Sequence, residues 1–240
     1  MTRVALVTGG TRGIGAAISL ALKAQGRKVI ANYASNDEAA AAFKAEHGID
    51  VVKFNVANFE ECEAGIAKVV AEHGPIEILV NNAGITRDGT LSRMRRDMWD
   101  AVLDTNLGSC YNMCKLTFDG MKERKFGRVV NVGSVNGQAG QYGQVNYAAA
   151  KSGIHGFTKA LAQEGARYGI TVNAIAPGYV DTEMVRAVPG EVLRKIVAKI
   201  PVGRLGHAED IARGVAFLTA DDADFVTGST MSINGGMHMY

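Results

Sequence analysis

The sequence predicts one doubly wound α/β domain, in which a parallel sheet of seven strands carries helices on both faces. Short, continuously apolar runs alternate along the chain with longer segments of helical periodicity. Such runs are typical of parallel strands that are buried on both faces. A glycine-rich turn follows the first run, and the four prolines fall outside the predicted helices and strands. These observations together predict the fold class.

The first half of the chain supplies four of these strands. The run Val-Ala-Leu-Val at residues 4–7 predicts the first strand, and a helical pattern at 13–25 follows the glycine-rich turn. An alanine-rich stretch at 39–42 indicates an exposed helix, and a longer helical pattern occupies 59–73. The remaining strands of this half are predicted at residues 28–32, 51–55 and 76–80.

The second half repeats the alternation. Helical patterns at residues 98–121 and 147–168 lead into strands at 127–132 and 170–176, and a last strand is predicted at 229–233. No repeat or linker interrupts the chain, so we predict a single domain over residues 1–240. Within it, residues 180–205 contain a Pro-Gly pair and an amphipathic run, and we interpret them as a lid that closes over substrate.

Composition excludes several classes of function. The chain has 240 residues, 47% of them hydrophobic and 21% charged, so it can bury a sizeable core. Its formal charge of +2 gives no electrostatic case for a nucleic acid or a membrane surface as partner. No apolar run reaches the roughly 18 residues of a membrane-spanning helix, and the first residues lack the apolar stretch of a secretory signal. We therefore expect a soluble cytoplasmic protein.

The three cysteines, Cys62, Cys110 and Cys114, are interpreted as small core residues. Their odd number in a long chain argues against a framework of disulfide bonds. No histidine lies near Cys110 and Cys114 in the sequence, so we predict no metal site there.

The glycine-rich turn predicts a dinucleotide site. The loop places Gly9, Gly13 and Gly15 around Arg12 and Ile14, between the first strand and the first helix. Glycines at such a junction allow a tight turn and close approach of the backbone to a pyrophosphate, which binds at the helix N-terminus. A glycine-rich run alone is a weak signal, but this position in the chain favours a Rossmann-type fold.

The end of the second strand indicates which dinucleotide binds. An NAD enzyme places a carboxylate there to accept hydrogen bonds from the ribose hydroxyls. This chain has no carboxylate until Asp37, and Arg12 in the glycine loop can pair with a 2′-phosphate. The alternative is that Arg12 is a solvated loop residue. The two features together predict NADPH as the cofactor.

Three residues form a candidate catalytic group. Ser134 closes the fifth strand, and Tyr147 and Lys151 lie four residues apart on the following helix, so they share a face. A lysine ammonium beside a tyrosine favours the phenolate and is expected to lower the tyrosine pKa from about 10 toward neutrality. Ser134 can donate a second hydrogen bond to a substrate oxygen. Tyr-x-x-x-Lys alone is common on surface helices, but the serine and the nucleotide loop favour catalysis.

These motifs resemble the short-chain dehydrogenase/reductase family over nearly the whole chain. The resemblance rests on Thr8-Gly-x-x-x-Gly13-x-Gly15, the Asn-Asn-Ala-Gly run at 81–84, Ser134, Tyr147-x-x-x-Lys151 and the Pro-Gly pair at 177–178. It implies that Tyr147 is the general acid, that Ser134 orients a carbonyl, and that Lys151 holds the nicotinamide ribose. It also implies that Asn106 anchors a proton-relay water and that the protein is a homotetramer built on the helices at 98–121 and 147–168. Further cofactor contacts implied by it are those of Asn55, Val56, Asn82, Ala83, Gly84, Ile85, Pro177, Gly178, Val180 and Thr182.

Within the family, the chain is similar to bacterial reductases of β-ketoacyl thioesters. One branch reduces acetoacetyl-CoA to the (R)-3-hydroxy ester for polyhydroxybutyrate, and the other reduces acyl groups on acyl carrier protein for fatty-acid synthesis. The segment at 138–147 is closer to the CoA branch. The residues that we expect at the substrate are Asp88, Gln141, Tyr142, Gly143, Gln144 and Tyr179. Alternatively, the two glutamines form hydrogen bonds with the loop backbone, and Asp88 lies in a solvated turn. Tyr179 can likewise be a core residue of the lid.

Two alternatives stay open. Lys122, Arg124, Lys125 and Arg128, with Arg167, form a basic cluster that could dock an acidic carrier protein, although a solvated helix end explains it as well. A nucleotide-binding sensor without chemistry is a more remote alternative. It would be expected to lack the tyrosine or the lysine, and both are present.

Overall fold

The computed structural model describes residues 2–182, 185 and 190–239. One parallel sheet of seven strands, in the order β3-β2-β1-β4-β5-β6-β7, forms the centre of this part of the chain. The strands are β1 (Val4–Val7), β2 (Lys28–Tyr33), β3 (Asp50–Lys53), β4 (Ile76–Asn81), β5 (Gly127–Val132), β6 (Ile170–Pro177) and β7 (Thr230–Ile233).

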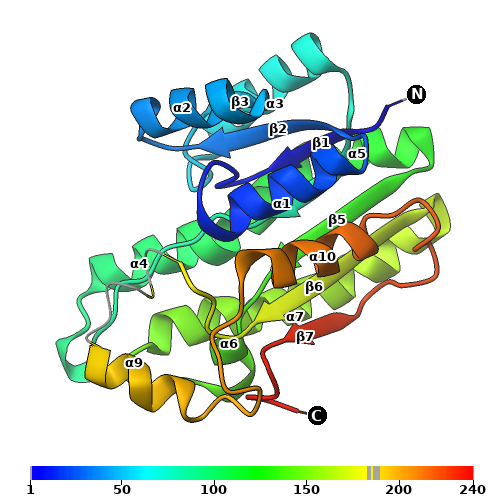
Figure 1. Cartoon of the computed structure of the whole chain (residues 1–240). Helices are drawn as coiled ribbons and strands as arrows, with labels where there is room; N and C mark the ends of the chain where they lie inside the picture. Colours follow the sequence, from blue (N-terminus) through cyan, green and yellow to red (C-terminus); the bar gives the residue numbers. More distant parts are fainter. Residues whose placement is uncertain (1, 183–184, 186–189, 240) are drawn as a thin grey trace.

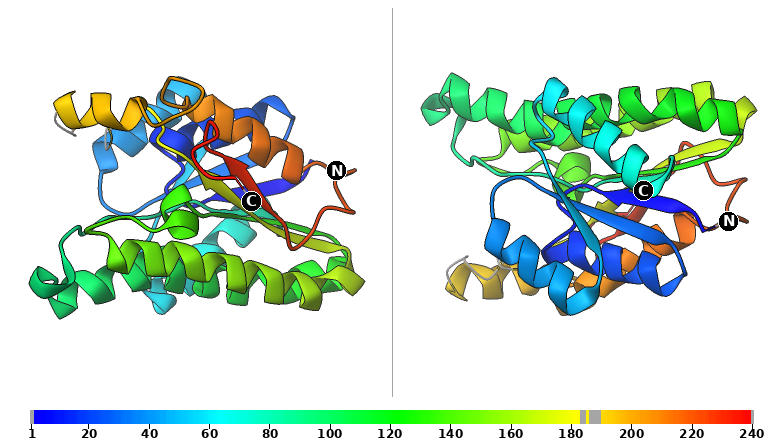
Figure 2. Two further views of the ribbon diagram at one scale, coloured as in Figure 1. Left: turned by 90° about the horizontal axis from the view of Figure 1, so that it is seen from below. Right: turned by 90° about the horizontal axis from the view of Figure 1, so that it is seen from above.

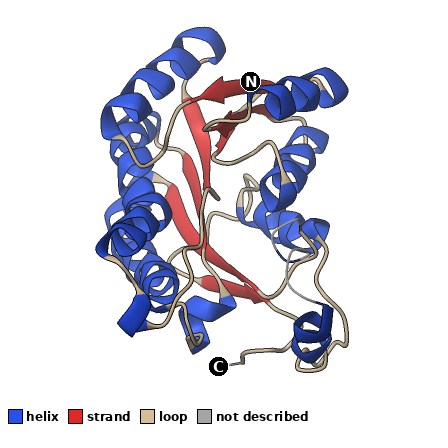
Figure 3. Ribbon diagram, turned by 90° about the vertical axis from the view of Figure 1, so that its left-hand side faces the viewer, coloured by secondary structure: helices blue, strands red, loops and turns tan. Residues whose placement is uncertain are grey.

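Helices cover both faces of the sheet, as Figure 3 shows, and the predicted fold class is confirmed. On one face lie α1 (Gly13–Ala24), α2 (Asp37–His47) and α10 (Ala208–Leu218), and on the other lie α3 (Phe59–His73), α5 (Ser109–Arg124) and α7 (Val145–Gly165) (Figure 1). Shorter segments are η1 (Leu91–Arg93), α4 (Arg96–Leu103), η2 (Asp104–Gly108), α6 (Val135–Ala139), η3 (Ala166–Tyr168) and α9 (Gly190–Val197).

The core consists of two apolar layers, one on each side of the sheet. Every residue of β1 and of β5 is buried, because these strands have neighbours on both edges and helices on both faces. Ile18 and Leu22 of α1 pack into one layer, and Met113 and Met121 of α5 pack into the other. Figure 2 shows the two helical layers separated by the sheet. All three cysteines are free and buried, so their interpretation as core residues is confirmed.

The strand order places the functional end of the domain. The order reverses between β1 and β4, so the loops that leave these two strands diverge at their carboxyl ends. In open α/β sheets, ligands bind in the crevice that this divergence creates. The glycine loop and the Asn-Asn-Ala-Gly run follow β1 and β4 at this point.

Two sequence-based predictions need correction. The predicted helix at 98–121 is not continuous: α4 and α5 are joined by η2, one turn of π-helix that contains Asn106. A π-turn widens the helix by one residue per turn, which local periodicity does not reveal, and such turns are frequent at functional sites. Pro177, predicted to lie outside the strands, is the last residue of β6 and pairs with Ile233. The next residue, Gly178, continues the ladder by donating its N–H to Ile233 O.

Candidate active site

The glycine loop fits the backbone of a dinucleotide. Gly9 and Gly13 have φ angles of +59° and +51°, a region that side chains rarely adopt. A Cβ on Gly15 would lie 2.0 Å from Gly9 O, so only glycine allows α1 to start this close to β1. Within the described residues, no side chain caps the N-terminus of α1, and its first turn has no acidic residue. This leaves the positive end of the helix dipole available to a phosphate, with Ile14 partly exposed beside it.

The end of β4 is joined to the same loop. Asn82 donates from Nδ2 to Thr8 O at 2.9 Å, and Thr8 Oγ1 accepts from the backbone N–H groups of Asn82 and Ala83. A Cβ on Gly84 would lie 3.3 Å from Asn106 Oδ1 and 3.5 Å from Lys151 Nζ. The predicted cofactor segment 82–85 therefore lies between the phosphate loop and the candidate catalytic residues.

The second strand ends without a carboxylate, and the first one after it already has protein partners. Asn32 is buried, and its side chain accepts from Gly9 N at 3.3 Å and donates to Phe54 O at 2.9 Å. Asp37, the first carboxylate after β2, accepts from Tyr33 Oη at 3.0 Å and pairs with Lys53 Nζ at 2.8 Å. These bonds lower the pKa of Asp37, chiefly through the hydrogen bond from Lys53. Arg12 is exposed at the start of α1.

The other predicted cofactor residues lie around this crevice. Asn55 Oδ1 accepts from Ala57 N at 3.1 Å in the turn after β3, and Val56 is buried. Val180 forms a parallel bridge with Gly206, which fixes the chain after Pro177 and Gly178. Thr182 Cγ2 lies 3.7 Å from the position of a Cβ on Gly13, so the segment after β6 reaches the phosphate loop.

The four predicted catalytic residues are brought together. Ser134 caps α6, its Oγ accepting from Asn136 N at 3.1 Å, and it also makes a hydrogen bond with the Tyr147 side chain. Lys151 is buried, donates to Val132 O at 2.7 Å, and lies 5.8 Å from the centroid of the Tyr147 ring. Asn106 Oδ1 accepts from Ile85 N at 2.8 Å, and its Nδ2 donates to Ile85 O at 3.0 Å.

The pKa values differ from the sequence-based expectation. Burial raises the pKa of Tyr147, although its hydrogen bond with Ser134 opposes that effect, and nearby Asp88 and Tyr179 raise it further. Burial also lowers the pKa of Lys151 to about 8. The expectation that Lys151 lowers the tyrosine pKa is therefore not met in this structure. The reason is geometric: the ammonium donates to the Val132 carbonyl and is itself desolvated.

The predicted substrate residues separate into three groups. Gln144 and Asp88 face each other, with Gln144 Nε2 donating to Asp88 Oδ2 at 2.9 Å. Gly143 O accepts from Gly89 N at 2.8 Å, so Gly143 belongs to the same junction. Gln141 and Tyr142 are exposed, Tyr142 by 87%. Tyr179 is partly buried and close enough to Tyr147 to affect its ionisation.

One residue of the basic cluster, which is considered both as a solvated helix end and as a docking surface, is not on the surface. Arg128 is only 2% exposed and donates to the carbonyl oxygens of Gly127, Gly169, Ala220 and Asp221. These acceptors come from distant segments, so the sequence could not show that they surround the guanidinium. Three of the other four side chains make surface contacts: Lys122 pairs with Asp119, Arg124 donates to Ile76 O, and Arg167 lies over the Tyr168 ring. Lys125 is exposed.

Two residues at the site were missed by the sequence analysis. Asn146 is fully buried and donates from Nδ2 to Arg87 O at 3.0 Å and to Met98 O at 3.1 Å. Asn136 donates from Nδ2 to Gln144 Oε1 at 2.9 Å. Asn146 directly precedes Tyr147, and a polar residue at the buried start of a helix was the available signal. Among the described residues, no group of three His, Cys, Asp or Glu side chains could hold a metal ion.

Comparison with known proteins agrees with this geometry. A family model described as enoyl-(acyl carrier protein) reductase matches residues 9–238. The chain belongs to the short-chain dehydrogenase/reductase family. Members of the family are oxidoreductases, and the family implies a nicotinamide cofactor. In the described part of the chain, no helix is long and apolar enough to cross a membrane.

Relatives within the family differ in their degree of similarity. The chain is 62% identical to an acetoacetyl-CoA reductase of Shinella zoogloeoides, with 98% of each chain covered. It is 61% identical to an acetoacetyl-CoA reductase of Rhizobium meliloti (strain 1021), over 99% of each. A 3-oxoacyl-[acyl-carrier-protein] reductase of Escherichia coli (strain K12) is 45% identical, over 99% of this chain and 98% of the relative.

Proposed function

We propose that this protein reduces acetoacetyl-CoA to (R)-3-hydroxybutyryl-CoA with NADPH, and so supplies the precursor of polyhydroxybutyrate. One observation carries the catalytic part of the proposal: Ser134, Tyr147, Lys151 and Asn106 meet beside the glycine loop at the carboxyl ends of the strands. The identity to relatives named acetoacetyl-CoA reductase supports the choice of thioester, because the carrier-protein reductase is more distant.

The reaction needs a hydride at C3 of the acyl group and a proton at its oxygen. A bound nicotinamide supplies the hydride. Tyr147 donates its phenolic proton to the oxygen as negative charge develops there. Ser134 donates a hydrogen bond to the same oxygen, for which its geometry is suited because Asn136 N already occupies one lone pair of the hydroxyl.

Lys151 and Asn106 support this proton transfer. The buried Lys151 ammonium lies 5.8 Å from the centroid of the Tyr147 ring, where it would hold the nicotinamide ribose next to the proton donor. Asn106 sits in the π-turn, where it holds Ile85 and is placed to anchor a water that returns the proton. The widened turn brings the amide inward, while α4 packs against α7 and α5 packs against the sheet.

The preference for NADPH rests on charge at the end of β2. The carboxylate of Asp37 is bound by Tyr33 and Lys53, and Asn32 offers an amide where an NAD enzyme has a carboxylate. Arg12 is exposed at the start of α1, where its guanidinium can pair with a 2′-phosphate.

A CoA ester is favoured over a carrier-protein ester because the more similar relatives are acetoacetyl-CoA reductases. The basic cluster does not decide between the two esters: Arg128 is buried, but Arg124, Lys125 and Arg167 are exposed. We further propose that residues 180–205 act as the substrate lid, with α9 as its helix. Arg194 of α9 can meet CoA phosphates, whereas Lys195 already pairs with Glu191 at 3.0 Å. Arg186, a third candidate, lies outside the described residues.

We also infer that the protein is a cytoplasmic homotetramer. The outer sides of α5 and α7 lie next to each other, and a hollow between them is lined by Tyr111, Phe118, Phe157 and Leu161. Tyr111 is 55% exposed, which is large for an aromatic side chain on a helix. A second copy packed on this face would bury it.

The test is the initial rate of NADPH oxidation with acetoacetyl-CoA and with acetoacetyl-carrier protein at equal concentrations. We expect a much higher kcat/KM for the CoA ester, a slower rate with NADH, and loss of turnover in Tyr147→Phe with NADPH binding retained. A strong preference for the carrier protein would reassign the enzyme to fatty-acid elongation. Turnover that survives Tyr147→Phe nearly intact would show that another group is the acid.

A further inference from the structure

The loop at residues 85–89, which follows the cofactor segment, is fixed by hydrogen bonds at four of its five residues. Asn106 holds Ile85 through both backbone groups, and Asn146 holds Arg87 O. The Asp88 carboxylate accepts from Gln144, and Gly89 N donates to Gly143 O. Three of these ties come from the four residues that immediately precede Tyr147.

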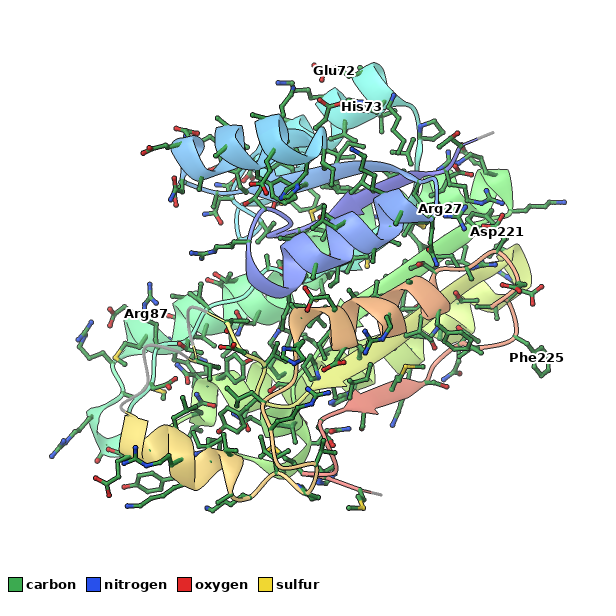
Figure 4. The ribbon with its side chains drawn as sticks, in the orientation of Figure 1. Arg27, Glu72, His73, Arg87, Asp221 and Phe225 are labelled. Carbon is green, nitrogen blue, oxygen red and sulfur yellow. The ribbon has the colours of Figure 1, made fainter. Side chains whose placement is uncertain are left out.

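This loop lies at the catalytic end of the sheet. Figure 4 shows Arg87 at the opposite end of the molecule from Arg27 and Asp221, which pair near the amino end of β1. The Arg87 guanidinium folds onto its own loop by donating to Thr86 O at 2.8 Å. The loop therefore connects the cofactor segment to the start of the helix that carries Tyr147 and Lys151.

Gln144 is the central member of the junction. Its Nε2 donates to Asp88 Oδ2 and its Oε1 accepts from Asn136 Nδ2, both at 2.9 Å. An ionised carboxylate only accepts hydrogen bonds, so Asp88 requires the amide nitrogen on its side of Gln144. The amide oxygen then faces Asn136, which has a donor to offer. The orientation of the glutamine is thus fixed by its two partners.

The other end of this chain of hydrogen bonds reaches Ser134. Asn136 belongs to α6, and its backbone N–H donates to Ser134 Oγ at 3.1 Å. The same residue therefore holds the serine hydroxyl with its main chain and Gln144 with its side chain. The path Asp88–Gln144–Asn136–Ser134 joins the loop after β4 to the hydroxyl that contacts Tyr147.

We propose that Gln144 is a positioning residue for the reduction. It sets Ser134 and Tyr147 relative to each other by bridging Asp88 and Asn136. The proposal rests on the proposed function, since it concerns the geometry of the same proton transfer. It gives Gln144 a role within the protein, since both polar ends of its side chain have protein partners.

The bridge requires a side chain that donates at one end and accepts at the other. Gln144→Glu keeps the acceptor for Asn136 but places a second carboxylate against Asp88, so the two repel each other. Adding Asp88→Asn restores a donor and an acceptor at this contact, with the polarity reversed. The double variant Asp88→Asn/Gln144→Glu has the same net charge as the natural pair and can form both hydrogen bonds.

The experiment compares the single and the double variant in steady-state kinetics with NADPH and acetoacetyl-CoA, and in thermal unfolding. Displacing a catalytic group by about 1 Å can cost on the order of a hundredfold in rate. We expect Gln144→Glu to lower kcat at least about tenfold with KM changed less than about threefold, and the double variant to recover kcat to within about threefold. Gln163→Glu, the same substitution on an exposed position of α7, is the matched control and should change neither constant.

Three results overturn the proposal. If Gln144 binds substrate through its amide, KM rises in Gln144→Glu and stays raised in the double variant. If the double variant recovers its melting temperature but not kcat, the bridge serves stability alone. If the double variant recovers neither its melting temperature nor kcat, Asp88 and Gln144 are not coupled. The natural protein is assayed first: absence of turnover with either thioester overturns the proposed function, whereas active protein with an unrescued double variant overturns the positioning role only.

Discussion

The buried lysine of the site should make the folded protein less stable at neutral pH, and this can be measured. Lys151 is 4% exposed, and within the described residues it has no acidic partner; its hydrogen bond is to the neutral Val132 carbonyl. Burial lowers its pKa from 10.5 to about 8. At about 1.4 kcal/mol per pKa unit, holding the ammonium charged in the folded state costs roughly 3 kcal/mol at pH 7.

The sign of the pH dependence follows from where each state releases the proton. Below pH 8 both states hold it, so the cost is present in full. Between pH 8 and 10.5 the unfolded chain keeps the proton that the folded protein has lost, and the folded protein becomes relatively more stable as pH rises. Lys151→Met removes this contribution. Its unfolding free energy relative to the natural protein should therefore fall by about 2 kcal/mol between pH 7.5 and 9.5.

Urea unfolding followed by far-UV circular dichroism, at one protein concentration and without cofactor, measures this difference. The lost hydrogen bond to Val132 and any change in packing are the same at both pH values, so they cancel in the comparison. Lys159→Met, on an exposed position of α7, should show no such dependence. A constant difference between Lys151→Met and the natural protein across this pH range would refute the reasoning.

Two further substitutions test the loop and the buried arginine. Gly15→Ala places a Cβ against Gly9 O, so the phosphate loop must shift, and we expect NADPH binding, measured by fluorescence titration, to weaken at least about tenfold. Gly156→Ala, where the added Cβ meets open space, is the control, and equal binding by both variants would contradict the close approach. Arg128→Met leaves four buried or partly buried carbonyl oxygens without their donors and should lower the unfolding free energy by about 3–5 kcal/mol. That loss corresponds to a melting temperature lower by roughly 6–20 °C, and an unchanged melting temperature would show that the guanidinium is dispensable.

The sequence was sufficient for the fold because its signals are local. Apolar runs and helical periodicity placed all seven strands within two residues of their observed bounds, and the glycine loop marked the first strand–helix junction. Ser134, Tyr147 and Lys151 could also be found, because the structure brings them together through one strand end and one helix face.

The features that the sequence did not predict depend on contacts between segments that are distant along the chain. Arginine is usually exposed, so nothing at residue 128 indicates a buried side chain whose acceptors are supplied as far along the chain as Asp221. The π-turn around Asn106 changes the helix by one residue, which hydrophobic spacing over 98–121 does not reveal. Gln144 gave a plausible substrate contact, but its partners, Asp88 and Asn136, are known only once the loops are folded.

The buried cations at the two ends of the sheet differ in how many of their hydrogen-bond donors have acceptors. Toward the amino ends, the Arg128 guanidinium makes four hydrogen bonds with its five donors, so at most one is left for a ligand. At the carboxyl ends, Lys151 has three donors, and the described residues provide one acceptor, Val132 O. Because a buried cation with unused donors costs stability, we propose that a ligand with oxygen atoms, such as a ribose, completes the set. On this proposal, the donors that make Lys151 costly to bury are the same donors that make it, and not Arg128, suited to hold a ligand, and urea unfolding would detect that cost.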